Sequence, residues 1–429
     1  MRRKPIAVLA AAAVAGGGLW FATAATGQAS PADQAAPAAR TAPARAAAAP
    51  AVPFGSHSFS YAPGTLKPSG DQKANDAEVT GFYKKWKSNF IKQNCGNGWY
   101  EVYAADADHP YVAEAQGYGM VITATLAGAD ADAQKIFDGL LKYVIAHPSV
   151  NNKDLHAAEQ DTSCKSVNGS DSATDGDLDI AYGLLLADKQ WGSSGTHDYK
   201  ALAVKRINAI KKSELHSGSK LMKLGDWSSG DYDKISRTSD WMPGHFKAFK
   251  KATGDTTWDA VLSKTQQVTA DLQAKHAAGT GLLPDFVVNT TTTPKPASGE
   301  VLEDPHDGDY NWNACRDPWR LGSDAVINGD AKSRTAARAL NTWAKSKAGG
   351  DPAKITSGYK LNGTAYGDSN EAAFFAPFGV SAMTDGGSQA WLDSIWQKML
   401  ATSPSPTDYY STSVQLQSML VVTHNYWTP

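Results

Sequence analysis

The chain has 429 residues, of which 42% are hydrophobic, and its formal net charge at pH 7 is −2. Proteins that bind nucleic acid usually carry a basic stripe, and this sequence has none, so we expect no nucleic-acid partner. Only three cysteines are present, at positions 95, 164 and 315, and their wide spacing excludes a cysteine-rich zinc site.

The N-terminal part of the chain differs in composition from the rest. A basic Arg-Arg-Lys stretch precedes a long apolar run, which is typical of a secretory signal peptide over residues 1–29. An uncleaved membrane anchor is the alternative, and the many Gly and Ala residues of the run argue against it. Residues 30–53 are almost all Ala, Pro, Arg and Thr and are interpreted as a disordered linker. The sequence therefore predicts a secreted, extracellular protein with no stable membrane association after cleavage.

Residues 54–429 form the remaining part, and no second linker divides them, so we expect one large globular domain. We expect this domain to be a monomer. In an exported protein, one disulfide and one free thiol are the simplest use of three cysteines. Cys95 and Cys164 lie in polar, loop-like stretches, which favours their pairing and leaves Cys315 free, although the sequence does not fix the pairing.

Helical patterns dominate this domain. Apolar residues recur at three- and four-residue steps in the segments 75–93, 131–145, 180–191, 194–212, 241–252, 258–277, 333–347 and 389–401. Strand patterns are few, and LPDFVV at 283–288 is the clearest. No repeat of about 30–45 residues is visible, which argues against a solenoid. The number and length of the helices favour a closed ring of helical hairpins over a four-helix bundle.

Three carboxylates, Asp175, Asp177 and Asp179, stand just before the helical pattern at 180–191. A calcium-binding loop starting at Asp175 would need Gly at its sixth position and Glu at its twelfth, where this chain has Ile and Leu. Acidic residues in the first turn of a helix can bond its free N–H groups, and we expect Asp177 and Asp179 to do so. Asp175 is left over, because the glycine beside it frees the backbone to direct its side chain elsewhere.

The stretch ATDGDLDIAYGLLLADKQW, residues 173–191, resembles the signature segment of glycoside hydrolase family 8. It departs at Gly183, where the family prefers Ser or Ala. The resemblance implies that Asp175 is the active-site carboxylate that contacts the sugar beside the scissile bond and helps to hold it distorted. The likeness runs over most of residues 75–425, with three separate motifs in the same order.

A glycosidase needs one carboxyl group as proton donor and a second as base or nucleophile. In AEAQGYGM, residues 113–120, Glu114 has no Lys or Arg nearby, and partial burial without a cation would raise its pKa, as a general acid requires. The local sequence alone favours an ordinary Glu at a helix start. The segment resembles the family element in which this Glu donates the proton, and that resemblance implies that Glu114 is the general acid.

The second carboxyl group is less simple. Many family members carry Asp where this chain has Asn313, within YNWNACRDPWR, and an amide cannot deprotonate water. Either the chain is an inactive binding protein, or another residue supplies the base. The preceding acidic segment resembles the chitosanase and lichenase subgroup, in which a Glu of an inserted loop is the base. That resemblance implies Glu303, with Glu300 in reserve; the plain alternative is a solvated acidic loop.

Further family-like residues suit a sugar-binding cleft, in which aromatic rings stack on pyranose rings while charged groups bond hydroxyls. Trp227 begins a family-like WSS, and the stretch SRTSDWMPGHF places Ser239 and His245 near a helix start. His245 and the tryptophan of this stretch could equally be core residues. Arg320 is expected to pair with a catalytic carboxylate, while Asn370 and Pro377 have no role that we can derive. The predicted substrate-binding residues are Tyr118, Arg237, Asp240, Trp241, Tyr310, Asn313 and Arg316.

The family resemblance implies an all-α fold, an (α/α)6 barrel of six inner and six outer helices with an open substrate cleft, so that residues 54–429 would be a catalytic domain. It also implies inversion by single displacement, in which Glu114 protonates the glycosidic oxygen and Glu303 activates a water. The two carboxyl groups should then stand about 6.5–9.5 Å apart. No cofactor and no metal are expected.

The expected substrate is a polysaccharide, with chitosan ahead of mixed-linkage or β-1,4-glucan. The acidic loop and Asp240 would suit cationic glucosamine units, which favours an endo-chitosanase over a β-glucanase. Two rivals remain: a carbohydrate-binding protein that lost its base at Asn313, and a polysaccharide lyase on a similar helical toroid.

Overall fold

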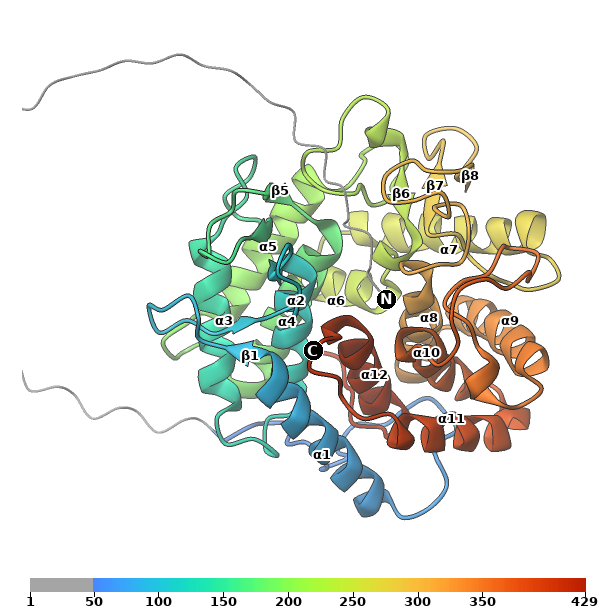
Figure 1. The fold of residues 1–429 in the computed structure, drawn as a ribbon. Helices are drawn as coiled ribbons and strands as arrows, with labels where there is room; N and C mark the ends of the chain where they lie inside the picture. The colour runs from blue at the N-terminus through green and yellow to red at the C-terminus, as the bar shows by residue number, and fades with distance from the viewer. Residues whose placement is uncertain (1–48) are drawn as a thin grey trace, which may run out of the picture.

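The structure is a computed structural model that describes residues 49–429, and within them twelve α-helices form two concentric rings (Figure 1). The outer helices are α1 (Gln72–Phe90), α3 (Ala133–Ala146), α5 (Tyr199–Ser213), α7 (Thr257–His276), α9 (Ala331–Ala348) and α11 (Gln389–Ala401). The inner helices are α2 (Ala113–Thr125), α4 (Thr174–Trp191), α6 (Pro243–Thr253), α8 (Asp317–Ile327), α10 (Ala372–Ala382) and α12 (Tyr409–Val422). Each inner helix contacts the next, and α12 contacts α2. The ring is therefore closed, and the expected (α/α)6 barrel is confirmed.

The two rings differ in how their sequences encode them. An outer helix such as α1 buries one face, with Val79, Trp86 and Phe90 inside, and all six outer helices match a predicted helical segment within a few residues. Every residue of α10 and of α12 is buried. Helices buried on all sides have no polar face, so periodicity did not reveal α2, α8, α10 or α12.

Except for residues 402–408 before α12, the loops that lead into the inner helices are much longer than the loops that leave them. Residues 277–316 precede α8, for example, whereas residues 328–330 suffice to connect α8 to α9. The inner helices therefore begin at one end of the barrel, where the long loops gather. The positive ends of their dipoles face the same way, which favours carboxylates there.

Short strands and single helical turns stiffen these loops. The strands form three small antiparallel sheets, β1–β2, β3–β4–β5 and β6–β7–β8. They are β1 (Ile91–Lys92), β2 (Glu101–Val102), β3 (Tyr111–Val112), β4 (Ala157–Gln160), β5 (Gly169–Ser172), β6 (Ser236–Arg237), β7 (Phe286–Val288) and β8 (Lys295–Pro296). The single turns are η1 (Tyr232–Lys234), η2 (Thr238–Asp240), η3 (Ala314–Arg316), η4 (Pro352–Lys354) and η5 (Gly386–Ser388). Strand β7 confirms the last three residues of the strand predicted at 283–288.

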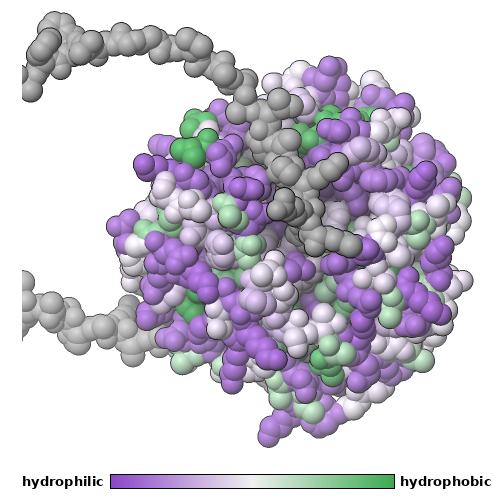
Figure 2. All heavy atoms as spheres, viewed as in Figure 1, coloured by the Kyte–Doolittle hydropathy of each residue, from purple (hydrophilic) through white to green (hydrophobic). Residues whose placement is uncertain are grey.

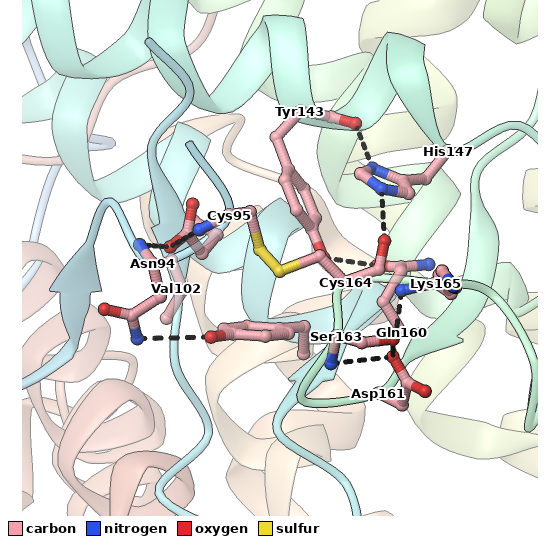
Figure 3. The surroundings of a disulfide bond; sticks show 12 residues. Asn94, Cys95, Val102, Tyr143, His147, Gln160, Asp161, Ser163, Cys164 and Lys165 are labelled. Atoms are coloured by element: carbon pink, nitrogen blue, oxygen red, sulfur yellow. Dashed lines mark hydrogen bonds between the residues drawn. A yellow bond between two sulfur atoms is a disulfide. The ribbon is translucent and has the colours of Figure 1, made fainter. Parts of the chain in front are cut away.

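A disulfide joins two of the long loops. Cys95, between β1 and β2, is bonded to Cys164, between β4 and β5 (Figure 3). Cys315 is a buried free thiol. His147 supports the bridge, because its Nε2 lies 3.0 Å from the carbonyl oxygen of Cys164. The favoured pairing is thus confirmed.

The segment before the barrel is described only from residue 49. The predicted signal peptide and most of the predicted linker lie outside the described residues. The linker's last residues are attached to the barrel: the Ala51 N–H donates to the carbonyl of Gln190 at 3.0 Å, and the Val52 N–H donates to its side-chain oxygen at 2.7 Å. Residues 51 and 52, which were assigned to the linker, are thus hydrogen-bonded to the end of α4.

The surface that the described residues present in Figure 2 is mainly hydrophilic, with hydrophobic residues in small, separate groups. Within residues 49–429, no helix combines the length and apolar character needed to cross a membrane.

Candidate active site

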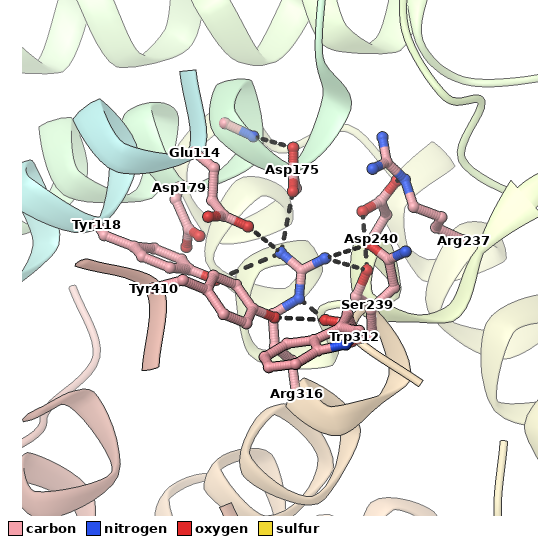
Figure 4. Close-up of polar contacts among 12 residues, drawn as sticks. Glu114, Tyr118, Asp175, Asp179, Arg237, Ser239, Asp240, Trp312, Arg316 and Tyr410 are labelled. Carbon is pink, nitrogen blue, oxygen red and sulfur yellow. Dashed lines mark hydrogen bonds and ion pairs between the residues drawn. The ribbon is translucent and has the colours of Figure 1, made fainter. Parts of the chain in front are cut away.

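The candidate site lies where the inner helices begin, and the Arg316 guanidinium is at its centre (Figure 4). Arg316 stands immediately before α8 and is 1% exposed. Its Nη1 donates to Glu114 Oε2 at 2.7 Å and to Asp175 Oδ2 at 3.0 Å. One cation therefore joins the first turns of α2 and α4, which lie far apart in the sequence.

Asp177 lies on the other side of α4 from Asp175, because residues two apart in a helix are turned by about 200°, whereas Asp179 lies on the same side as Asp175 but one turn further along the helix. Only Asp175 reaches the site. Asp177 pairs with Arg206 of α5 and accepts the N–H of His156 at 3.0 Å. Asp179 pairs with Arg320 of α8 at 2.5 Å.

The expectation that Asp177 and Asp179 cap α4 is therefore wrong. The N-cap residue of this helix is Ala173, and no side chain caps it. Both carboxylates instead form buried ion pairs with other helices, which satisfies their charge more fully than solvent-facing N–H groups would. Arg320, which was expected to pair with a catalytic carboxylate, pairs instead with Asp179, one helical turn further along α4 than Asp175.

Glu114 is held as a half-enclosed carboxyl group at the start of α2. Its side chain is 17% exposed, Arg316 contacts one oxygen, and the Tyr409 hydroxyl donates to the other. Burial raises the pKa of Glu114, Arg316 opposes that rise, and the nearby Asp175 carboxylate adds to it. The balance is a raised pKa.

Asp175 has the opposite balance. Burial alone would raise its pKa, but the positive charges of Arg237 and Arg316 outweigh burial and lower it. Two neighbouring carboxyl groups on one guanidinium thus have pKa values shifted in opposite directions, as is typical of an acid–base pair in an active site.

Glu303 approaches from the opposite side, on the loop between β8 and η3. Its Oε2 accepts the Asn313 amide N–H at 2.8 Å, and its Oε1 lies 3.3 Å from Arg237 Nη1. Burial raises the pKa of Glu303, while Arg237 and the Asn313 bond counteract that rise. Glu300, the reserve candidate, is exposed on the same loop.

The Asn313 side chain bridges the two halves of the site. Its Oδ1 accepts from Arg316 Nη2 at 2.8 Å, and its Nδ2 donates to Glu303 and, at 3.3 Å, to Asp285. A continuous chain of polar contacts therefore runs from Glu114 through Arg316 and Asn313 to Glu303.

A second group of acids lies beneath this chain. Asp240 is 3.6 Å from Arg237, and burial, opposed by that charge, raises its pKa to about 7. Asp285 accepts the backbone N–H groups of residues 311, 313 and 314, and its burial raises its pKa to about 8. Asp317 accepts from the Thr238 hydroxyl at 2.9 Å.

Sequence reasoning missed Tyr409, Asp285 and Asp317. Tyr409 is the first residue of α12, a helix that was itself not predicted, so no local pattern pointed to it. Asp285 lies inside the predicted strand LPDFVV, where an isolated Asp between apolar residues was a usable signal for a buried polar role.

Two predicted substrate-binding residues are core residues. Trp241 is 2% exposed, and its indole N–H donates to the Ser236 hydroxyl at 2.8 Å. Tyr310 is fully buried against Tyr359 and Phe378. Neither ring presents a face on which a sugar could stack, so these two expectations are corrected.

The other predicted positions divide between the site and its surroundings. Tyr118 is buried, and its hydroxyl accepts from Arg316 Nη1 at 3.3 Å; Ser239 accepts from Arg316 Nη2 at 2.9 Å. His245 lies lower, bonded to Asp179 at 2.7 Å. Asn370 is exposed and accepts from Lys398, and Pro377 lies within α10.

Comparison with known proteins adds an independent finding. The sequence matches the family described as "Glycosyl hydrolases family 8" over residues 71–424. It is 44% identical to a β-glucanase of Niallia circulans over 383 residues, which cover 89% of this chain and 92% of the relative. It is 38% identical to an endoglucanase of Bacillus sp. (strain KSM-330) over 378 residues, or 85% of this chain and 80% of that one.

Solved structures agree. The apo structure of a β-1,3-1,4-glucanase from Paenibacillus sp. X4 has a TM-score of 0.86 at 44% identity and covers 89% of this chain and 100% of its own. Rex8A from Paenibacillus barcinonensis, complexed with xylose, is 17% identical with a TM-score of 0.70, covers 85% of this chain and 97% of its own, and shares the fold alone. With the barrel and the family match over nearly the whole described chain, these likenesses show that the protein is a glycosidase and belongs to glycosyl hydrolase family 8.

Proposed function

We propose that this protein is an inverting endo-β-glucanase in which Glu114 is the general acid and Glu303 the general base. The observation that carries the proposal is the polar chain from Glu114 through Arg316 and Asn313 to Glu303, since it brings two carboxyl groups to one site without direct contact. Inverting glycosidases need such a separation, because a water molecule must fit between the base and the sugar.

Glu114 has the properties of the acid. Its pKa is raised by burial and by Asp175, so the carboxyl group keeps a proton that it can transfer to the glycosidic oxygen. After transfer, the carboxylate is stabilised by Arg316 and by the Tyr409 hydroxyl, which already contact its two oxygens. The same contacts orient it toward the leaving group.

Glu303 is the base because Asn313 has no basic atom. The Asn313 amide and Arg237 bond its carboxylate, which keeps it oriented and favours the ionised form that can accept a proton from water. Asn313 thus serves the base where many relatives would carry an Asp.

Asp175 completes the mechanism as an ionised group. Its pKa is lowered by Arg237 and Arg316, so it stays negative while Glu114 is protonated. A fixed negative charge at that position can accept a hydroxyl bond from the sugar beside the scissile bond and stabilise the positive charge that develops on its ring.

A neutral β-glucan is the proposed substrate, in preference to chitosan. The relatives named above are β-glucanases and an endoglucanase. The acidic loop that favoured chitosan uses its charges internally: Asp307 is buried, Asp309 pairs with His306, and Asp304 accepts from Asn311. Few of these carboxylates are left to bind glucosamine ammonium groups.

The test is reducing-sugar release from lichenan, carboxymethylcellulose, chitosan and xylan by wild type, Glu114→Gln, Glu303→Gln and the matched control Glu300→Gln. We expect release from lichenan by wild type and by the control, and a loss of about 10²–10⁴-fold in the other two variants. Proton NMR of the first product should give the α-anomer. Equal background release by all four proteins would establish the binding-protein alternative, and an unsaturated product would establish the lyase.

We also propose that the protein is exported. The basic and apolar pattern of residues 1–29 supports this, and so does the Cys95–Cys164 bridge, because disulfides persist in oxidising compartments. The intact mass of the protein in the culture medium tests it: cleavage near residue 29 is expected, and a full-length cell-bound chain would contradict it.

A further inference from the structure

Glu303 lies on a loop without regular secondary structure, although a general base must hold its geometry closely. The loop, residues 297–308, is here called the base loop. Its two ends meet: the Ala297 N–H donates to the Phe286 carbonyl at 3.0 Å, and the Phe286 N–H donates to the Asp307 carbonyl at 2.8 Å. Gly308 allows this close approach, because a Cβ there would lie 2.1 Å from the Ala297 oxygen.

The interior of the base loop is filled by the side chain of Asp307, which is 1% exposed. Its Oδ2 accepts the backbone N–H groups of Val301 and Leu302, both at 2.7 Å, and of Glu303 at 3.1 Å. Its Oδ1 accepts the N–H of Asp304 at 3.0 Å. Four consecutive backbone N–H groups, including that of Glu303, thus donate to the Asp307 carboxylate.

The hydrogen bonds to Asp307 restrain a part of the base loop that hydrophobic packing holds only weakly. Val301 and Leu302 are only partly buried, against a small cluster that contains Leu224 and Phe286. Bonds from N–H groups to a charged acceptor are roughly twice as strong as neutral ones, so a single buried carboxylate can fix the whole turn.

We propose that Asp307 is the positioning residue of the general base: it holds residues 301–304 in the conformation that directs Glu303 at Asn313 and the attacking water. This inference rests on the proposed role of Glu303. In this role Asp307 touches no substrate atom and acts only through Glu303.

The charges around Glu303 make the proposal testable by pH. The pKa of Glu303 is raised, because burial and the Asp307 charge outweigh the opposing effect of Arg237 of β6, the Asn313 bond and Arg316 of η3; Asp285 is a further charged neighbour. Removing the Asp307 charge should therefore lower the pKa of Glu303 and move the acidic limb of kcat/KM to lower pH. A purely structural defect would reduce activity without moving this limb.

The experiment compares Asp307→Asn, Asp307→Glu and the control Asp309→Asn on lichenan. For Asp307→Asn we expect kcat to fall about 10–100-fold, KM to change much less, and the acidic limb to move down. Asp307→Glu keeps the negative charge but moves the carboxylate oxygens, so kcat should fall while the acidic limb of kcat/KM stays in place. This variant also tests the positioning role if Asp307→Asn does not fold. Asp309→Asn, which removes the charge that pairs with His306, should resemble wild type.

A double-mutant cycle with Glu303→Ala separates the two possible failures. If Asp307 acts through Glu303, Asp307→Asn should change the residual activity of Glu303→Ala by less than about twofold. An equal loss in both backgrounds, or wild-type kinetics in Asp307→Asn and Asp307→Glu, would overturn the positioning role and leave the base intact. Full activity of Glu303→Gln would instead overturn the proposed function itself.

Discussion

The amide nitrogen of Asn313 lies 2.8 Å from Glu303 Oε2 and donates a hydrogen bond to it. The bond lowers the pKa of Glu303 against the effect of burial. On the proposed assignment of Glu303 as base, Asn313 supports a base ten positions earlier on the same loop, and the two residues act as a pair.

An Asp at position 313 should therefore reduce the activity of this enzyme. In Asn313→Asp, a donor is replaced by a like charge, so the pKa of Glu303 should rise and the acidic limb of kcat/KM should move to higher pH. Asn313→Ala removes the donor without adding charge and should move the limb less, in the same direction. An Asn313→Asp variant with unchanged or higher activity on lichenan would indicate that residue 313 can take over as base.

Glu114→Gln should show a leaving-group dependence. The variant cannot donate a proton, so hydrolysis of polymeric β-glucan should fall about 10²–10⁴-fold. An aryl glycoside with an acidic phenol needs little protonation and should lose far less. Comparing the two substrates measures this, with Glu303→Gln as the control that should lose activity on both. Equal losses for Glu114→Gln on both substrates would assign Glu114 a role other than acid.

Tyr409→Phe should extend activity to higher pH. The Tyr409 hydroxyl donates to the Glu114 carboxylate, which favours the ionised form and lowers the pKa of Glu114. Without it, Glu114 should hold its proton to higher pH, and the alkaline limb of the pH–rate profile should move up. The measurement is the bell-shaped dependence of kcat/KM on pH for wild type and for Tyr409→Phe. A shift of the acidic limb in place of the alkaline limb would link Tyr409 to the base.

The Asp179–Arg320 pair should stabilise the barrel in a defined pH window. Burial would raise the pKa of Asp179, but Arg320 and His245 lower it to about 2. The downward shift in the pKa of Asp179 should contribute about 2 kcal/mol to the free energy of unfolding. This contribution should be complete above about pH 4 and lost as the pH falls toward about 2, because Asp179 binds its proton at a higher pH in the unfolded chain than in the folded one.

Asp179→Asn tests this contribution by urea unfolding at pH 7 and at pH 3. The variant leaves a buried guanidinium without its charge partner, so about 3–5 kcal/mol should be lost at pH 7, and less at pH 3. Asp132→Asn is the control: Asp132 is 61% exposed and 3.9 Å from Lys87, so its loss should cost less than about 1 kcal/mol. Equal sensitivity of both variants would contradict the assignment.

The disulfide should contribute to stability through the unfolded state. Cys95 and Cys164 are 69 residues apart, and closing a loop of that length is worth about 2–4 kcal/mol. The double substitution to Ser should lower the Tm to that of reduced wild type and should make the Tm insensitive to dithiothreitol. A Tm equal to that of oxidised wild type would show that the bridge constrains little.

The sequence predicted the outer helices well because each repeats apolar residues on one face, as α1 does with Val79, Trp86 and Phe90. It did not predict α12, whose residues are all buried. Apolar residues recur periodically in a sequence only when a helix has one face in the core and another face in solvent. A helix such as α12, which is buried on all sides, has no solvent face. The family resemblance, which depends on residue identity, supplied the number of helices that periodicity could not.

For the site, the sequence by itself determined which carboxyl groups stand in motifs, Glu114 and Asp175 among them. Only the tertiary structure decided their partners: Arg316 reaches Glu114 across 202 positions of the chain, and Glu303, unlike Glu300, reaches Asn313. It also turned Asp177 and Asp179 toward Arg206 and Arg320. A motif fixes side chains within a few residues of one another, whereas charge pairing and burial depend on which helix ends the closed ring brings together.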